Sequence, residues 1–304
     1  MSRAVRPTVR VTENARLAIG NTALSGRESL SVRQKVSRNS TLGRARVSAK
    51  KLQTIKNALT NRDLAIIAAV KDCRLITTLQ LQRLHFTDYK SPQGAARASR
   101  RALQRLSDQG IVSRRDRRIG GARRGSTSYV YSLGLVGARL LSEKRLRTYT
   151  TDPSDYFFDH TLELTELYTQ FHEQAHVGSL QLLEIQTEPD CWRPLARGTL
   201  RPDMFVRTAH GDEEYSWFIE VDRATTHLPA LLKKMRQYEQ YYAAGVEQAA
   251  HGVFPQVLWI VSDGKRMAAL NKAVSATQSG PGGLFVVKTT EHALAYICKP
   301  DTLG

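Results

Sequence analysis

The stretch that decides the fold is Leu200-Arg201-Pro202-Asp203-Met204-Phe205-Val206-Arg207-Thr208-Ala209-His210-Gly211-Asp212-Glu213-Glu214-Tyr215-Ser216-Trp217-Phe218-Ile219-Glu220-Val221-Asp222. Two strand-like segments flank a turn-rich break, and a two-residue turn at Gly211-Asp212 would pair them as an antiparallel β-hairpin. In that register Asp203 lies opposite Glu220, and both side chains point to the same face of the sheet.

Two carboxylates that face each other repel, and they destabilise a hairpin unless a positive charge lies between them. Oxygen ligands at this separation suit Mg²⁺ or Mn²⁺. The pair therefore predicts a divalent-cation site with Asp203 and Glu220 as ligands. Paired acids at strand ends can also be solvated or salt-bridged with a purely structural role, and the spacing alone does not separate the two readings.

The charge of the chain is divided unevenly along its length. The 304 residues are enough for about two domains. Of the net charge of +17, residues 1–58 carry +11, residues 59–147 carry +13 and residues 148–304 carry −7. A basic front half on an acidic back half is typical of a nucleic-acid-binding protein with a separate second domain. We expect double-stranded DNA as the partner.

The remaining composition excludes other classes. No apolar run approaches the roughly 20 residues that span a bilayer, and no signal peptide is recognisable, so we expect a cytoplasmic protein without a membrane partner. Cys73, Cys191 and Cys298 are too far apart for a disulfide framework or a cysteine zinc site. Residues 1–57 form a basic arm that we expect to be mostly disordered, with at most a short helix around Leu30–Lys35. The arm could add phosphate contacts or have no specific role.

Residues 58–147 predict a winged helix-turn-helix. A capping box at Thr60-Asn61-Arg62-Asp63 starts the first helix, a second helix starts near Thr77, and Ser91-Pro92 starts a third that runs to about Asp108. The expected core positions of these helices are Leu64, Ile67, Ala68, Leu79, Leu81, Leu84, Ala95, Ala98, Ala102, Leu103 and Leu106. Two strands joined by Gly120-Gly121 would form the wing.

Arginines crowd the third helix and the wing. A helix that carries Arg and Gln in the major groove, beside a cationic wing over the backbone, is the docking mode of such domains. The DNA-binding residues that we predict are Arg97, Arg100, Arg101, Gln104, Arg114, Arg115, Arg117, Arg118, Arg123 and Arg124. Winged helices also serve protein contacts, but the number of arginines favours DNA.

A polar linker, Arg147 to Pro153, leads to a second domain over residues 154–304. Its pattern predicts helix, three strands, helix, strand and helix, followed by two short strands. The expected ranges are Asp159–His176, Leu180–Gln186, Arg201–Thr208, Tyr215–Asp222, Leu228–Ala243, Gln256–Ser262, Lys265–Ala276, Leu284–Val287 and Ala293–Ile297. The αβββαβ order is the core of the restriction-endonuclease-like, or PD-(D/E)XK, nucleases, so the fold class that we expect is α/β (α+β).

The chain also resembles one family more closely. A basic winged helix precedes His160-x-Leu162, Arg201-Pro202-Asp203, Phe218-Ile219-Glu220-Val221-Asp222-Arg223 and a Lys-rich helix that ends in tyrosines. This combination resembles the replication-relaxation family of plasmids and integrative elements, which is similar to MobC-type plasmid relaxases. The resemblance covers roughly residues 55 to 275 and implies origin binding with nicking or relaxation of DNA.

The third motif position of these nucleases is normally Lys, and here it is Asp222, which the hairpin register places opposite Arg201 as a salt-bridge partner. We expect Lys234 to replace the missing lysine, with a plain solvated lysine as the alternative. Gln237-x-x-x-Tyr241 resembles a helix motif of some of these nucleases. Leu231, Met235, Tyr238 and Tyr242 would form the core stripe of this helix. On the first helix, Glu163 is the expected third metal ligand, and His160 fits a core histidine better than a ligand.

Two other motifs suggest different chemistry. His172-Glu173-Gln174-Ala175-His176 matches the HExxH zinc pattern, but the helix ends at once without a third ligand, and these residues fall on the expected solvent side. Tyr238, Tyr241 and Tyr242 suggest a tyrosine nucleophile, which we rank below metal-activated water.

The function that we predict is site- or origin-directed DNA binding with metal-dependent phosphodiester cleavage. Asp203, Glu220, Lys234 and Gln237 are the catalytic candidates, and Asp203, Glu220 and Glu163 are the candidate ligands of Mg²⁺ or Mn²⁺. Mobilisation or replication proteins are possible partners. The alternative is a catalytically inactive origin-binding, replication-initiation or regulatory protein.

Overall fold

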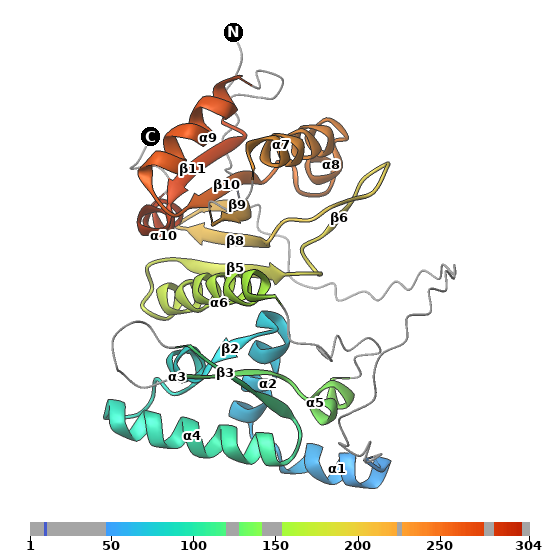
Figure 1. Ribbon diagram of the computed structural model, residues 1–304, viewed down its shortest axis with the longest axis vertical. Helices are drawn as coiled ribbons and strands as arrows, with labels where there is room; N and C mark the ends of the chain where they lie inside the picture. The colour runs from blue at the N-terminus through green and yellow to red at the C-terminus, as the bar shows by residue number, and fades with distance from the viewer. Residues whose placement is uncertain are drawn as a thin grey trace.

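The computed structural model describes residues 9–10, 47–119, 128–141, 154–223, 227–276 and 283–299, and its elements are shown in Figure 1. The structure combines helices and strands in a mixed α/β fold, as the sequence predicts. Among these residues, none of the helices has the length and apolar character needed to cross a membrane. The predicted linker and the predicted helix around Leu30–Lys35 lie outside the described residues.

The N-terminal unit, residues 47–141, combines helices with a small antiparallel sheet of order β2-β4-β3. The Thr60/Asp63 capping box and the Ser91 cap start two of its helices, as the sequence predicts, and the helix predicted to start near Thr77 begins with a second capping box, Thr77/Gln80. Its elements are α1 (Ala49–Ala58), α2 (Asn61–Cys73), β2 (Ile76–Thr77), α3 (Thr78–His85), α4 (Pro92–Asp108), β3 (Val112–Ile119), β4 (Ser128–Leu133) and α5 (Leu135–Leu140).

Two expectations for this unit are corrected. Helix α1 lies within the segment predicted to be mostly disordered; Ser48 caps it, and its Leu52 and Ile55 pack against the main core. The buried face of α2 is made by its Ile66, Ile67, Val70 and Cys73, whereas Leu64 is 48% exposed and Ala68 is also exposed. Leu79, at the start of α3, is likewise exposed. The stripe on α4 is as predicted, with Ala102 half-buried.

The C-terminal unit, residues 154–299, is built around one mixed sheet of order β11-β10-β9-β8-β5, and β1 (Val9–Arg10) pairs with the start of β9. Strands β9, β10 and β11 are parallel, and β8 is antiparallel to both β5 and β9. The elements are α6 (Asp155–His176), β5 (Gln181–Thr187), β6 (Arg193–Pro194), β7 (Thr199–Leu200), β8 (Met204–His210), β9 (Glu213–Asp222), α7 (Leu228–Ala243), α8 (Val246–His251), β10 (Gln256–Val261), α9 (Gly264–Ala276), β11 (Phe285–Thr289) and α10 (Thr290–Cys298).

The predicted strand at Ala293–Ile297 is wrong, because this segment is part of helix α10. Its buried residues, Ala293, Tyr296 and Ile297, have helical spacing, and a short apolar run does not by itself distinguish a strand from a helix. The hairpin of β6 and β7 and the short helix α8 have no counterpart among the predicted elements.

Helices cover both faces of this sheet: α6 and α10 lie on one face, α7 and α9 on the other (Figure 1). Alternation along β9 sends Trp217, Ile219 and Val221 to the α6 side. Phe218 and Glu220 therefore point to the α7 side, where Phe218 joins the second core.

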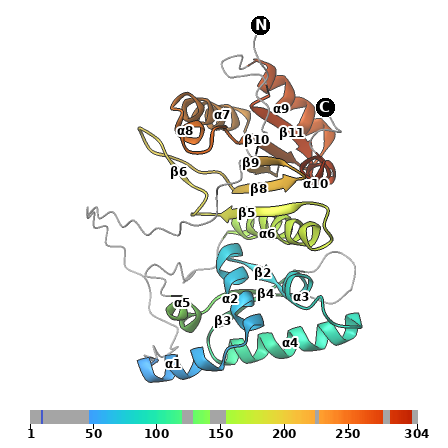
Figure 2. The same ribbon diagram turned by 180° about the vertical axis from the view of Figure 1, so that it is seen from behind.

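Helix α6 is covered on two sides, because the N-terminal unit packs against it opposite the sheet (Figures 1 and 2). Arg83 of α3 donates to Glu166 at 2.7 Å and to Glu173 at 2.7 Å. The Thr165 hydroxyl donates to the backbone oxygen of Leu75 at 2.7 Å. One hydrophobic cluster runs from the helices of the N-terminal unit through α6 into the sheet.

The burial of His85 at this junction predicts that the protein loses stability in acid. Burial lowers the pKa of His85 to about 4, with His172 and Arg62 adding to the shift. The folded state therefore binds fewer protons than the unfolded state, so the stabilisation from His85 is complete above pH 6.5 and is lost as the pH falls toward 4. The free energy of unfolding should fall between pH 7 and pH 5, and we expect this fall to be about 2 kcal/mol smaller in His85→Gln than in the wild type. Urea titrations at the two pH values measure the difference. An identical pH dependence in both proteins would contradict this assignment.

Candidate functional site

Asp203 and Glu220 meet at one end of the β8–β9 hairpin. The turn is two residues long, with His210 opposite Glu213 and Gly211 at φ 59°, the left-handed conformation that such a turn needs. The pairing continues to Met204 opposite Ile219, and the Asp203 backbone N–H donates to the Ile219 oxygen at 3.1 Å. The predicted register is confirmed. Asp203 and Glu220 are only 8% and 2% exposed.

Helix α7 brings a lysine to this pair, as the sequence predicts. The Lys234 ammonium contacts Glu220 and lies 4.0 Å from the Asp203 carboxylate. One turn later on α7, the Tyr238 hydroxyl donates to the other Glu220 oxygen. Gln237 lies between them on the same helix and is half-buried. Three elements, β8, β9 and α7, therefore converge on one charged cluster.

The charges in this cluster are strongly coupled. Burial raises the pKa of Glu220 to about 8, an effect that neighbouring Asp203 reinforces and Lys234 opposes. Burial alone would lower the pKa of Lys234, but Glu220 and Asp203 together raise it. Burial would raise the pKa of Asp203, yet Lys234, His160 and the Val221 N–H hold it below its usual value. Lys234 is therefore a firmly held cation between the two carboxylates.

Helix α6 contributes a histidine. His160 Nε2 lies 3.4 Å from Asp203 Oδ1, while the second Asp203 oxygen accepts the Val221 N–H at 2.8 Å. Burial would lower the pKa of His160, but Asp203 raises it above the usual value. The sequence placed His160 on the buried face without assigning it a role in the site, and its position beside Asp203 could have been suspected only from the His160-x-Leu162 motif.

Glu163, the expected third metal ligand, does not join Asp203 and Glu220. Its carboxylate lies 3.5 Å from Arg223 Nε, and burial raises its pKa. Among the residues that the structure describes, no three His, Cys, Asp or Glu side chains are close enough to share a metal ion. The structure brings Asp203 and Glu220 together, as predicted, but it does not add Glu163 to them as a third ligand.

The remaining pair still suits a hard divalent cation. The space between Asp203 and Glu220 already accommodates the positive charge of Lys234, which acts as a stand-in for a cation. Mg²⁺ commonly uses only one or two carboxylates, with waters and substrate phosphate completing its octahedron. Asp203 and Glu220 therefore fit such an ion, provided that Lys234 gives up its contact with Glu220.

Asp222 does not pair with Arg201, contrary to the prediction. Its carboxylate accepts Arg266 Nε of α9 at 2.6 Å, and the Arg201 guanidinium instead lies 4.6 Å from the centre of the Trp192 ring. The predicted register ends with the strand, because β8 begins at Met204 and the chain before it turns into the β6–β7 hairpin. Asp222 is therefore part of a buried ion pair next to the site.

The two motifs that suggest other chemistry, the HExxH segment and the α7 tyrosines, have structural partners. The prediction that the HExxH residues face solvent is wrong for Glu173. Glu173 binds Arg83 of α3, so this part of the motif faces the N-terminal unit. Of the α7 tyrosines, Tyr238 and Tyr241 are the fully buried pair, whereas Tyr242, predicted in the core stripe, is half-buried. The Tyr241 hydroxyl donates to Glu247 at 2.8 Å.

The candidate DNA-binding side chains that the structure describes come from α4 and β3 of the N-terminal unit. Arg97, Arg100, Arg101 and Gln104 are all exposed on α4, opposite its buried stripe, and Gln104 donates to Asp108 at 2.8 Å. On β3, Arg114 is exposed over the Tyr129 ring and Arg115 donates to Ser132. The side chains of Arg117, Arg118, Arg123 and Arg124 lie outside the described residues.

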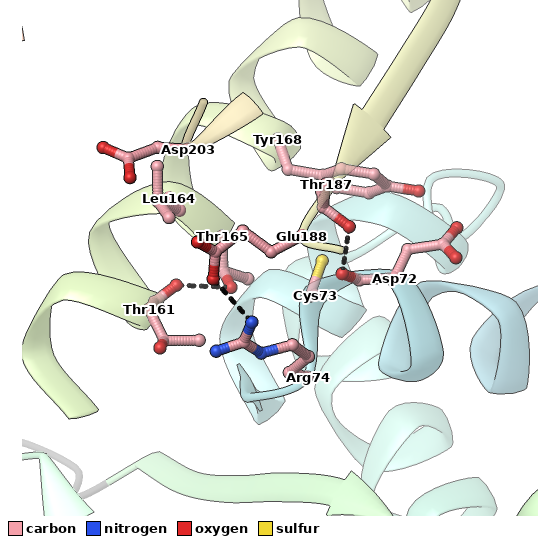
Figure 3. A pocket seen from close by; sticks show the side chains of 10 residues that line it. All are labelled: Asp72, Cys73, Arg74, Thr161, Leu164, Thr165, Tyr168, Thr187, Glu188 and Asp203. Carbon is pink, nitrogen blue, oxygen red and sulfur yellow. Dashed lines mark hydrogen bonds and ion pairs between the residues drawn. The ribbon is translucent and has the colours of Figure 1, made fainter. Parts of the chain in front are cut away.

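A small cavity separates the site from the N-terminal unit (Figure 3). Arg74, at φ 65° between α2 and β2, donates to Glu188 at 2.6 Å, while the Asp203 carboxylate points away from that ion pair. The cavity volume of about 20 Å³ is room for one or two waters, so it is too small for a substrate. This cavity is therefore not the place where DNA reaches Asp203.

Comparison with known proteins identifies the family. The family model described as Replication-relaxation matches residues 67–257, a span that includes Asp203, Glu220 and Lys234 and most of both units. A comparison with curated proteins and one with solved structures gave no significant match. The chain belongs to the replication-relaxation family, and this membership indicates a role in the replication or relaxation of plasmid or mobile-element DNA.

Proposed function

We propose that this protein binds double-stranded DNA at an origin or other specific site through a winged helix and cleaves one strand with a PD-(D/E)XK-like centre. The observation that carries the proposal is the cluster of Asp203, Glu220 and Lys234, which holds two buried carboxylates and a cation at the end of the β8–β9 hairpin away from its turn. The Lys, normally two residues after the Glu in this motif, would here be supplied by α7 as Lys234.

The N-terminal unit supports the binding half of the proposal. A helix with exposed Arg and Gln side chains precedes a two-stranded hairpin, which is the order of a winged helix. The concentration of positive charge in residues 59–147, +13, suits the phosphate backbone, which provides most of the affinity of such proteins.

The proposed chemistry is phosphodiester hydrolysis. Asp203 and Glu220 would hold Mg²⁺ or Mn²⁺, and the bound ion would supply charge stabilisation at the phosphate and an activated water. Once Glu220 holds the ion, Lys234 would be released from that contact and would donate to the phosphate or orient the water, where its charge offsets the negative charge that develops. Gln237, the predicted fourth catalytic residue, is half-buried and lies one turn after Lys234 on α7. His160 would keep Asp203 ionised and oriented.

The test is a nicking assay on supercoiled plasmid DNA. We expect conversion to the open circle only with Mg²⁺ or Mn²⁺, and its complete loss in Asp203→Asn/Glu220→Gln. Both substitutions keep the shape of the side chain and remove its charge, and the variant should still bind DNA in a gel-shift assay. Nicking that survives in this double variant would eliminate the assigned site.

A specific observation also favours the inactive alternative. Asp222 replaces the usual lysine and is used in an ion pair with Arg266, and Lys234 provides a positive partner for Glu220. In this alternative the cluster only stabilises the fold of an origin-binding or replication-initiation protein. It predicts sequence-specific DNA binding with no cleavage under any metal condition. Mobilisation or replication proteins would then supply the enzymatic step.

A further inference from the structure

The hairpin of β6 and β7 projects from the C-terminal unit beside the candidate centre (Figures 1 and 2). Arg193 pairs with Leu200, and the segment then leads through Arg201 and Pro202 directly to Asp203. From residue 193 to residue 201 the sequence Arg-Pro-Leu-Ala-Arg-Gly-Thr-Leu-Arg contains three arginines and no acid, although residues 148–304 have a net charge of −7. The hairpin is therefore a basic element on an acidic unit.

The base of the hairpin is rigidly attached. Arg193 Nε donates to the buried Glu247 at 2.9 Å, and the guanidinium lies 4.9 Å from the centre of the Phe205 ring. Leu200 and Cys191 are fully buried in the core on the α7 side. Arg193 is thus used for anchoring, and the anchored base fixes the direction of the exposed tip.

The other two arginines remain available. Arg197, at the tip, and Arg201 are both exposed, and within the described part of the chain neither forms an ion pair with a carboxylate. The stacking of Arg201 on Trp192 restricts its side chain without using its N–H donors. The hairpin therefore presents two exposed guanidinium groups close in sequence to Asp203.

We propose that Arg197 and Arg201 form a second DNA contact, which holds the backbone phosphates of the strand that enters the candidate centre. This inference rests on the proposed function for the identity of the ligand. One guanidinium group can bind two phosphate oxygens at once. Arg201 is two residues from Asp203, so its contact would lie next to the phosphate to be cleaved. Without such an element, the acidic unit would repel the DNA that the N-terminal unit binds.

The test compares two double variants of the full chain. Arg197→Ala/Arg201→Ala removes the proposed contact, and Lys265→Ala/Lys272→Ala removes two exposed cations of α9, on the other side of the unit, as the matched control (Figure 1). Fluorescence anisotropy with a labelled DNA duplex of random sequence, in EDTA and over a range of salt, gives the affinity and its salt slope. We expect the hairpin variant to lose about tenfold in affinity and about two units of slope, since each phosphate contact contributes about 0.9. The control should change neither.

Two further comparisons decide whether Arg197 and Arg201 contact phosphate. Arg197→Lys/Arg201→Lys should restore the slope, because lysine keeps the charge, and equal slopes for the Ala and Lys variants would overturn the phosphate contact. Equal affinities and slopes for wild type and the Arg197→Ala/Arg201→Ala variant would overturn it as well. Because no cleavage occurs in EDTA, a chain that never nicks but shows the slope change would contradict the proposed function and leave this inference standing.

Discussion

Replacing Lys234 with methionine is expected to slow metal-dependent nicking by a factor of about 10³ and to lower the free energy of unfolding by about 2 kcal/mol. The first effect follows from the loss of the only cation that touches both carboxylates among the described residues. The second follows because Asp203 and Glu220, both buried, then lose the ammonium between them, and only His160, beside Asp203, is left among the described residues to offset their charge. Glu220 limits this cost by taking up a proton, which its raised pKa favours. Plasmid nicking rates and urea unfolding measure the two effects.

The neighbouring lysine provides a matched control. Lys233 is exposed on the same turn of α7, so Lys233→Met should leave the nicking rate and the stability unchanged. The double variant Lys234→Met/Glu220→Gln removes the charge imbalance and should recover most of the lost stability, since breaking one side of a buried pair costs more than replacing both. It should not recover nicking. Wild-type nicking by Lys234→Met would show that Lys234 has only a structural role.

The parts of this site that the sequence predicts are those governed by strict local periodicity. Gly211 permits a two-residue turn, and from that turn the alternation of β8 and β9 places Asp203 opposite Glu220 without further information. Lys234 was predicted because α7 has a regular helical period after a proline start, so its polar flank can be identified.

Beyond the ends of β8 and β9, the hairpin register no longer predicts which residues pair. The predicted Asp222–Arg201 pair required the hairpin register to continue past Pro202, which has no N–H for the ladder. Instead Asp222 finds Arg266, which is distant in sequence. A contact of this kind depends on how α9 crosses the sheet, and a single sequence contains no signal for it.

Helix α6 shows a second limit. Its HExxH residues look solvent-facing because Glu173 and its neighbours are polar, yet the N-terminal unit supplies Arg83 as a partner for that face. Polarity in a sequence indicates that a side chain needs a polar partner, and it does not indicate whether water or another part of the protein provides it. The position of His160 beside Asp203 likewise depends on the approach of α6 to the end of β8.

Replacing Phe171 with alanine is expected to lower the free energy of unfolding by about 3–5 kcal/mol and to weaken the whole molecule in one step. Phe171 is fully buried on α6, in the one hydrophobic cluster that includes residues of the N-terminal unit and of the sheet. The cavity left by the ring would therefore loosen both packing surfaces of α6. Thermal unfolding should show one transition at a lower midpoint, with DNA binding and nicking lost together as the temperature rises.

The alternative outcome has a clear physical meaning. If the two units were independently stable, Phe171→Ala would produce two transitions, and DNA binding by α4 would persist after nicking had been lost. The ion pairs of Arg83 with Glu166 and Glu173 and the hydrogen bond from Thr165 to Leu75 argue against independence, because unfolding either unit would leave these groups without partners. Val177→Ala, at the 69% exposed end of α6, is the control and should shift the midpoint little. A single coupled transition would mean that α4 and the candidate centre are held in a fixed relation, so that the position of the bound site determines where the strand is cut.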